Sequence, residues 1–365
     1  MYYRDMLRER KRKQKRSFDT IVRAVATGIF IGSIFLNVVF LIVIIGMGVV
    51  LGGAGDRGRR GTGYEKVYID AGSVGFREGR KHEIAVIRID GLISQFDRRE
   101  GVFDYIENPV SAVSRQLSLI REDSLIKGVL LVIDSPGGTV TASDVLYHYI
   151  SSFTKETGIP VVALMKQVAA SGGYYVASSS QYIVAYPTSI VGSIGVVVGS
   201  FNFKELMDKY GVKYVMVKSG EHKGFLSPFT GVDDEDIAIV QNIADDMLRR
   251  FIDAVASGRE NLTREDVERL ADGRIYIAGE ALKKGLIDEV GYFEDAVRVL
   301  ASLASIGTPN VIEYQRTRGL RDFFGSVSAR LYPWTILKNQ LVPFGQDPAS
   351  YVGIYYVWNN ALFFR

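Results

Sequence analysis

The distribution of apolar residues divides the chain into one unbroken apolar stretch near the N-terminus and a longer body of short apolar runs. Residues 24–51 carry no charge, and Asn37 is their only strongly polar side chain. A helix needs about 20 apolar residues to cross a bilayer core, whereas a cleavable signal peptide usually has an apolar region of about 7–15. The stretch therefore predicts a retained transmembrane helix, and the small residues at 52–55 leave later processing open.

The body, residues 64–314, alternates short β-branched runs with helical segments. The runs show little polar alternation, which is typical of strands that are buried on both faces. The predicted strands are 84–89, 128–133, 160–165, 181–185 and 212–217. The predicted helices are 109–121, 142–154, 171–178, 234–257 and 263–270. This order predicts an α/β fold with a mostly parallel sheet and flanking helices.

Two segments outside the body do not follow the α/β pattern. Half of residues 52–63 are glycine, which predicts a flexible tether. Residues 315–365 form an aromatic-rich C-terminal tail with no clear helical or strand period. We expect the end of this tail to lie in a neighbouring chain's substrate groove or on the membrane surface.

The net charge of +3 is unevenly distributed. Residues 1–23 carry nine basic and three acidic side chains, so this arm is +6 and the remaining chain is −3. The positive-inside rule then predicts a cytoplasmic arm and a body on the outer side of the plasma (inner) membrane. Since the folded body has no basic excess, nucleic acid is not an expected partner.

The chain has no cysteine and only three histidines. The absence of cysteine excludes disulfides, thiolate metal sites and cysteine nucleophiles. With so few histidines a histidine-rich metal site is not expected, and we predict a site without a metal or organic cofactor.

Ser171 is the candidate nucleophile because it stands among small residues and precedes Gly172 and Gly173, at a predicted strand-to-helix turn. A helix that begins there would direct its free N–H groups toward the reacting atoms. The Gly172 N–H is thus a candidate oxyanion donor. The alternative is that Ser171 is an ordinary helix N-cap.

A second pair of glycines, Gly137 and Gly138, follows the predicted strand 128–133. Glycines at the end of a strand let backbone amides face a ligand without an intervening side chain. We therefore predict Gly138, with Gly137 as a further candidate, as the other half of an oxyanion hole. Asp134 is interpreted as a structural residue that caps this turn. The alternative, that residues 135–138 are simply a favourable turn sequence, is compatible with the oxyanion role, since the turn would place the amides.

Lys223 is the candidate general base. A lysine accepts a proton only if its pKa falls from about 10.4 toward neutrality, and burial can lower a lysine pKa by about 3–5 units. Lys223 lies in a Gly-Glu-His-Lys-Gly turn that follows the predicted strand 212–217, and Lys218 is the rival base. A Ser-His-Asp triad has little support, since Ser171 lacks the Gly-x-Ser-x-Gly context.

Ser193 lies between two glycines in the apolar run 190–196. The pattern indicates close backbone approach, and we expect an extended edge that pairs with a peptide substrate. Ser193 could hydrogen-bond the lysine and orient it. A buried serine satisfied by backbone groups is the equal alternative.

Taken in order, these motifs resemble the signal peptide peptidase A family, membrane-bound serine-lysine peptidases with a ClpP/crotonase-like fold. The resemblance implies that Ser171 is the nucleophile and Lys223 the general base, with Ser193 in a supporting role. It also implies a hydrophobic groove for remnant signal peptides and other unstructured chains. The matching stretches are 89–93, 133–138, 170–175, 192–196, 219–223 and 281–291.

The resemblance further implies homo-oligomers, by analogy octamers, in which neighbouring protomers contribute the lysine and the serine. The chain departs from the family at Gly224, where members often carry an acidic residue, and in the tail 315–365, which has no counterpart.

Three other functions remain open from the residues alone: a crotonase-type enzyme acting on acyl-coenzyme A, an inactive membrane scaffold, and another serine-lysine protease that cuts membrane proteins. An acyl-coenzyme A enzyme would need neither the membrane anchor nor Lys223. The presence of both Ser171 and Lys223 argues against an inactive scaffold. The sequence does not define physiological substrates, subsite preferences, the subunit count, the role of the tail, or whether the dyad forms within or between subunits.

Overall fold

The structure is a computed structural model that describes Arg23 and residues 27–42, 63–69, 81–99, 105–317 and 353–357. The chain divides into two compact units, residues 1–63 and 64–365, which are described separately. The described residues leave out nearly all of the predicted N-terminal basic segment (1–23) and tether (52–63). They also leave out both ends of the predicted apolar span (24–51).

In the N-terminal unit, residues 27–42 form a helix whose side chains are exposed. The Asn37 side-chain amide donates a hydrogen bond to the Ser33 carbonyl oxygen at 2.7 Å. The one strongly polar side chain of the apolar stretch is therefore satisfied within its own helix. Over the described residues, no helix combines the length and hydropathy that a membrane crossing requires.

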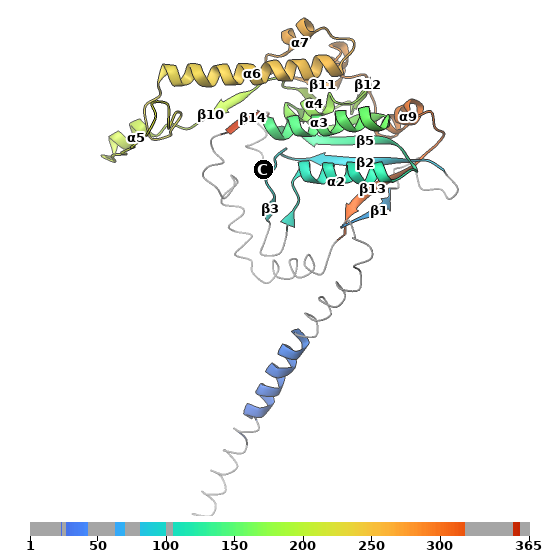
Figure 1. The fold of residues 1–365 in the computed structure, drawn as a ribbon, viewed down its shortest axis with the longest axis horizontal. Helices are drawn as coiled ribbons and strands as arrows, with labels where there is room; N and C mark the ends of the chain where they lie inside the picture. Colours follow the sequence, from blue (N-terminus) through green and yellow to red (C-terminus); the bar gives the residue numbers. More distant parts are fainter. Residues whose placement is uncertain are drawn as a thin grey trace, which may run out of the picture. The chain divides into compact units, whose positions relative to one another are not determined.

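The body is built on a mostly parallel sheet, as predicted (Figure 1). Neighbouring strands pair in parallel from β13 to β12, and β1 joins β13 in antiparallel orientation. At the C-terminal end of β7, β9 (Ile190–Gly192) pairs in parallel with β7 and antiparallel with β11 (Ile275–Ile277). The main order is β1 (Tyr64–Tyr68), β13 (Asn310–Arg316), β2 (Glu83–Asp90), β5 (Ile126–Ser135), β7 (Val161–Ala170), β8 (Tyr182–Ala185) and β12 (Glu289–Val290).

Helices cover both faces of this sheet. Alternate residues of β2 point to opposite faces: Ala85 and Ile87 join the larger core, whereas Ile84 and Val86 join the smaller one. The smaller core is closed by α9 (Phe293–Leu303). The larger core is closed by α2 (Pro109–Glu122), α3 (Val140–Thr157), α4 (Gly172–Ala177), α6 (Asp234–Gly258), α7 (Arg264–Leu270) and α8 (Ala278–Lys283).

The local sequence explains where several helices begin. Asn108 caps α2 by accepting a hydrogen bond from the Ser111 N–H, and Pro109 occupies the first helical position. Thr263 and Asp266 form a capping box at the start of α7. These signals explain why the predicted helices match the observed ones to within a few residues.

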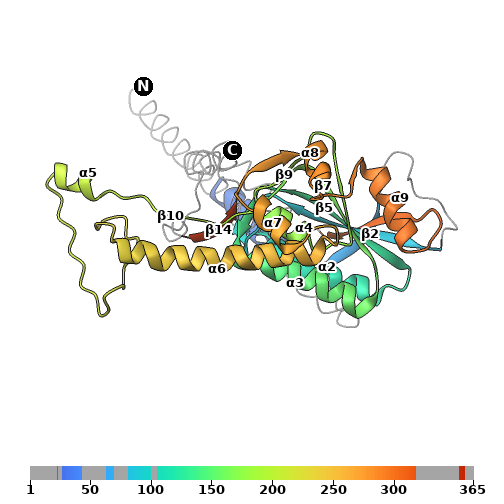
Figure 2. The ribbon, with the colours of Figure 1, turned by 90° about the horizontal axis from the view of Figure 1, so that it is seen from above.

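The predicted strand 212–217 is wrong. Residues 212–218 carry no regular secondary structure, and Val217 is 96% exposed. They belong to residues 201–233, here called the arm, which follows β10 (Val197–Gly199) and Ser200, leads to α6 and contains α5 (Lys204–Lys209). Figure 2 shows the arm projecting from the sheet with the N-terminal part of α6. An apolar β-branched run is therefore not sufficient evidence for a strand of the sheet.

Five residues of the C-terminal tail form β14 (Gly353–Val357). This strand lies between β10 and β6 (Gly137–Thr139) and is antiparallel to both. Within this chain, residues 353–357 of the tail therefore pair with their own body, and the expected position in a neighbour's substrate groove or on the membrane surface stays a prediction. A separate short ladder joins β3 (Arg98–Arg99) to β4 (Tyr105–Ile106).

Candidate active site

Ser171 stands between the end of β7 and the start of α4, as the sequence predicts. Its side chain lies in a buried setting, with the residue only 1% exposed, and its backbone is unusual at φ 53° and ψ −117°. A non-glycine residue in this region is strained, and such strain persists only where the surroundings enforce it. The Ser171 N–H donates to the Gly192 carbonyl oxygen at 2.7 Å, which helps to hold the turn.

The two predicted oxyanion glycines lie together beside Ser171. A Cβ atom built on Gly172 would be 3.0 Å from the Gly138 nitrogen and would overlap the Ser143 hydroxyl. A Cβ on Gly138 would overlap the carbonyl oxygen of Ile93. Both positions therefore require glycine, and the Gly172 N–H, as the first of α4, has no acceptor within that helix.

The loop that carries Gly138 is fixed by the segment after β2. The Ile93 N–H donates to the Gly137 carbonyl oxygen and the Thr139 N–H donates to the Ile93 carbonyl oxygen, both at 2.9 Å. Nearby, the Asp134 carboxylate accepts from the Val168 N–H at 3.2 Å, which ties β5 to the end of β7. This hydrogen bond supports the structural interpretation of Asp134. The bond joins two strands, however, and is not the turn cap that we predicted.

Ser193 adjoins the group that holds Ser171, because Gly192 accepts the hydrogen bond from the Ser171 N–H. Ser193 is also buried and has a positive φ of 52°, and its N–H donates to the Arg274 carbonyl oxygen at 2.8 Å. The expected free edge for a peptide is wrong for β9, since β7 and β11 occupy both of its sides. The next strand, β10, pairs with β14.

Lys223 lies far from Ser171 in the same chain. Its neighbour His222 contacts Asp236 in the first turn of α6, at 2.9 Å. At the other end of α6, the Phe251 ring packs against Tyr175 of α4 with centroids 4.9 Å apart. The fifteen residue steps of α6 from Asp236 to Phe251 span about 22 Å, at 1.5 Å per step. The described residues contain no hydrogen bond or ion pair between Ser171 and Lys223, and Lys223 is exposed.

The rival base Lys218 is no nearer to the nucleophile. Its ammonium group donates to the Glu221 carbonyl oxygen, within the same exposed arm as Lys223. A serine that lies beside the arm would therefore be near both lysines, and only substitutions can show which of the two is the base.

One contact near the site had no signal in the sequence. Asp144 of α3 accepts hydrogen bonds from Arg250 of α6, at 2.7 and 2.9 Å, and from the Tyr175 hydroxyl at 2.7 Å. Burial acts to raise the pKa of Asp144, but the hydrogen bonds from Arg250 and Tyr175 outweigh it and hold this pKa below its ordinary value. The cluster ties α6 to the helix that follows Ser171.

Comparison with known proteins identifies the family. Residues 154–307 match the model described as peptidase family S49. A putative signal peptide peptidase SppA of Enterococcus faecium is 33% identical over 258 residues, which cover 70% of this chain and 74% of that protein. The chain belongs to the signal peptide peptidase A family. It is therefore a serine peptidase.

Two further relatives agree with this assignment. A putative protease of Methanocaldococcus jannaschii is 35% identical over 227 residues, which cover 62% of this chain and 72% of that protein. A putative protease of Synechocystis is 35% identical over 236 residues, which cover 65% and 79% respectively. The S49 match includes Ser171, Ser193 and Lys223, whereas Gly138 precedes it.

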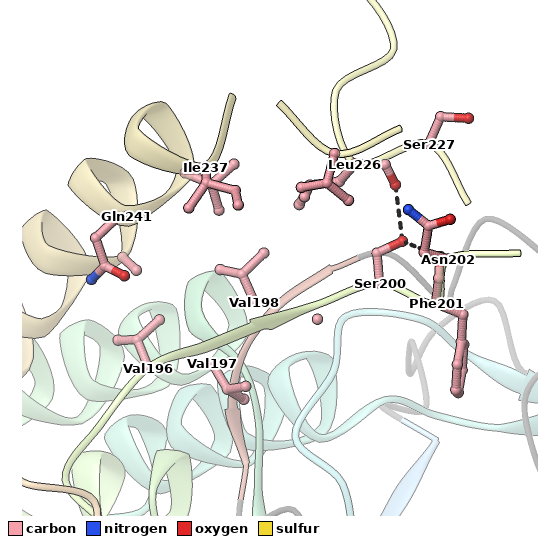
Figure 3. Close-up of a pocket in the computed structure, with 14 residues that line it drawn as sticks. Val196, Val197, Val198, Ser200, Phe201, Asn202, Leu226, Ser227, Ile237 and Gln241 are labelled. Atoms are coloured by element: carbon pink, nitrogen blue, oxygen red, sulfur yellow. Dashed lines mark hydrogen bonds between the residues drawn. The ribbon is translucent and has the colours of Figure 1, made fainter. Parts of the chain in front are cut away.

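An apolar pocket of about 490 Å³ opens where β10 leaves the body of this peptidase (Figure 3). Figure 3 shows the side chains of Val198, Leu226 and Ile237 on three sides of it, contributed by β10, the arm and α6. The Ser200 hydroxyl donates to the Leu226 carbonyl oxygen at 2.9 Å and links two of these walls. The pocket begins at Val196, three residues after Ser193.

Proposed function

We propose that this serine peptidase is a membrane-anchored endopeptidase in which Ser171 is the nucleophile and Lys223 the general base. The observation that carries the proposal is the setting of Ser171: a buried serine in strained conformation beside the Gly138 and Gly172 amides. Strain of this kind is typical of functional sites. Family membership favours this reading over an acyl-coenzyme A enzyme or an inactive scaffold.

The mechanism is acyl transfer. A neutral Lys223 amine removes the proton of the Ser171 hydroxyl, and the serine oxygen attacks the peptide carbonyl. The Gly138 and Gly172 N–H groups stabilise the oxyanion that develops on the carbonyl oxygen. Lys223 then protonates the leaving amine, and water hydrolyses the acyl-enzyme. Ser193 supports the lysine by hydrogen bonding, and no metal or organic cofactor takes part.

Lys223 acts on the Ser171 of a neighbouring chain. The separation of about 22 Å along α6 supports this arrangement, since a lysine side chain is far shorter. The exposure of apolar arm residues such as Phe201 and Val215 supports it as well, because a neighbour would cover them. Contact with that neighbour would also desolvate the lysine and favour its neutral form. The assembly is a homo-oligomer, an octamer by resemblance to the family.

The substrates are peptides, including remnant signal peptides and other unstructured chains. An extended peptide that takes the place of β14 beside β6 would bring its backbone next to Gly138 and Ser171. The apolar pocket beside β10 suits a hydrophobic side chain of such a peptide. Residues 24–51 anchor the enzyme in the plasma membrane. The basic segment 1–23 is then cytoplasmic, and the catalytic body lies on the outer side.

The test uses the full chain in detergent with a fluorogenic peptide. Ser171→Ala and Lys223→Ala are expected to lower kcat by at least about 1000-fold, since each removes one member of the dyad. Ser118→Ala and Lys155→Ala are the matched controls, because both residues are exposed and lie outside the proposed site and the arm. Circular dichroism checks that each variant folds.

Two results would contradict the proposal. If both dyad variants keep the activity of the parent, the peptidase site lies elsewhere. If Ser171→Ala is inactive while Lys223→Ala is active, the lysine assignment is wrong and Lys218 becomes the base to test.

A further inference from the structure

We propose that His222 and Asp236 are positioning residues that hold the Lys223 turn in the direction required to reach a neighbouring chain. The inference rests on the proposed function of Lys223. The His222–Asp236 contact would connect the Lys223 turn to α6, the helix that packs beside Ser171.

The Lys223 turn has little packing of its own to hold it. Residues 217–225 are all exposed. The turn is closed by local backbone hydrogen bonds, from the Lys223 N–H to the Gly220 carbonyl oxygen and from the Phe225 N–H to the His222 carbonyl oxygen. Gly224 has a φ of 108°, a conformation that strains any residue with a side chain, and it packs against the flexible end of Met216. Local bonds fix the shape of the turn but not its direction.

The turn is tied to the remainder of the chain on two sides. On the β10 side, the Ser200 hydroxyl donates to the Leu226 carbonyl oxygen, three residues beyond Lys223. On the α6 side, His222 Nδ1 lies 2.9 Å from Asp236 Oδ1, directly beside Lys223. The His222–Asp236 contact is therefore the tie that is closest in sequence to the lysine among the described contacts.

Helix α6 transmits this tie to the region around Ser171. Asp236 lies in its first turn, and Arg250 and Phe251 near its other end contact Asp144 and Tyr175. Tyr175 belongs to α4, the helix that Ser171 precedes. Because a helix is stiff over this length, the arm's lysine is oriented relative to its own chain's catalytic body. A displacement of 1 Å in a reacting group can lower the rate about 100-fold.

The charges around His222 favour the same contact. The charged groups that face it are Glu221 of the turn and Glu235 and Asp236 of α6, with Glu235 at 3.9 Å from Nε2. The hydrogen bond that His222 donates to the Asp236 carboxylate is the largest effect and raises the pKa of His222. The pair is consequently ionic at acidic pH, and it keeps a neutral Nδ1–H hydrogen bond above that pKa.

A carboxylate on Nδ1 is also how a histidine is oriented when it acts as a proton acceptor. The test must therefore separate positioning from proton transfer. An asparagine amide nitrogen can take the place of Nδ1 as a donor to Asp236, but asparagine does not titrate. His222→Asn thus keeps a positioning contact and removes any proton transfer.

The experiment measures kcat and KM of the full chain for His222→Ala, Asp236→Ala, the double variant and His222→Asn. We expect each alanine variant to lose about 10-fold in kcat with KM within about twofold, because the lysine is misdirected while the substrate site is intact. The double variant should be no worse than either single one. His222→Asn should recover most of kcat, with the same pH profile as the parent.

Asp246→Ala is the matched control, since Asp246 is an exposed carboxylate of α6 that pairs with Arg249 and not with the arm. Three results would overturn the inference: parental kcat in both alanine variants, a His222→Asn variant as inactive as His222→Ala, or a reduced oligomer mass in the alanine variants. Retained activity in Ser171→Ala would instead refute the proposed function, so the two failures are distinguishable.

Discussion

The regions around Ser171 and around Lys223 differ in almost every physical respect. Ser171, Gly138 and Gly172 lie in a buried setting at the ends of central strands, where every neighbour restricts the backbone. Lys223 lies on an exposed arm with turns and one short helix. The comparison teaches that folding of one chain completes the Ser171 half of the proposed site, whereas the Lys223 half stays incomplete within that chain, and our proposal assigns its completion to a neighbouring chain.

The composition of the arm supports this division. Exposed single apolar residues are ordinary, but a continuous set on one projecting segment is typical of an interaction surface. On the arm this set includes Phe201, Tyr210, Val215, Val217 and Phe225.

The largest effect is expected on the Ser171 side. Gly138→Ala and Gly172→Ala should each lower kcat by about 1000-fold, because the added methyl displaces a backbone amide that stabilises the oxyanion. Gly279→Ala is the matched control, since a Cβ there meets nothing within 4 Å. Peptide hydrolysis by folded Gly172→Ala at the parental rate would remove Gly172 from the site.

A second prediction tests the arm as an interaction surface. Val217→Asp should lower kcat by about 100-fold and reduce the oligomer mass, because a charge would be buried at the interface. The unfolding temperature of the isolated chain should not change, since Val217 contacts no core. Leu303→Asp, an exposed position on α9, is the control. If Val217→Asp leaves both kcat and the oligomer mass unchanged, the arm is not the interaction surface that our account requires.

The tail offers a third prediction. Deleting residues 346–365 removes β14 and exposes the edges of β6 and β10. Activity on extended peptides should rise about fivefold, because a peptide no longer competes with the chain's own strand. Unchanged activity, oligomer size and membrane affinity would show that the tail has no part in substrate binding.

The smallest expected effect concerns the link between the two regions. The folded-state pKa of Asp144 lies below the unfolded value, so its contribution to stability is complete above about pH 4 and is lost as the pH falls through the folded pKa. Asp144→Asn should cost about 1 kcal/mol at pH 7, since the pair is partly exposed. Urea unfolding at pH 7 and pH 3 measures this cost, and an equal cost at both pH values would contradict it.

The Ser171 half of the proposed site could be predicted from the sequence, because local strand and glycine patterns determine its structure. Strands 128–133 and 160–165 are recognisable as buried, and the ends of neighbouring parallel strands meet, which brings Gly138 to Ser171. The same reasoning failed for 212–217, where an apolar run lies on the arm. No pattern connected His222 to Asp236 or Asp144 to Arg250, since pairs of exposed side chains have no periodicity.

The central claim is that Ser171 and Lys223 act together across two chains. Co-expressing Ser171→Ala and Lys223→Ala in equal amounts, and purifying mixed oligomers that carry two different tags, tests it most directly. Each variant alone should be inactive, and random mixing should restore about a quarter of the parental activity, since one site in four then receives both intact residues. Mixed oligomers without activity would contradict the claim, because a dyad within one chain cannot be restored by mixing.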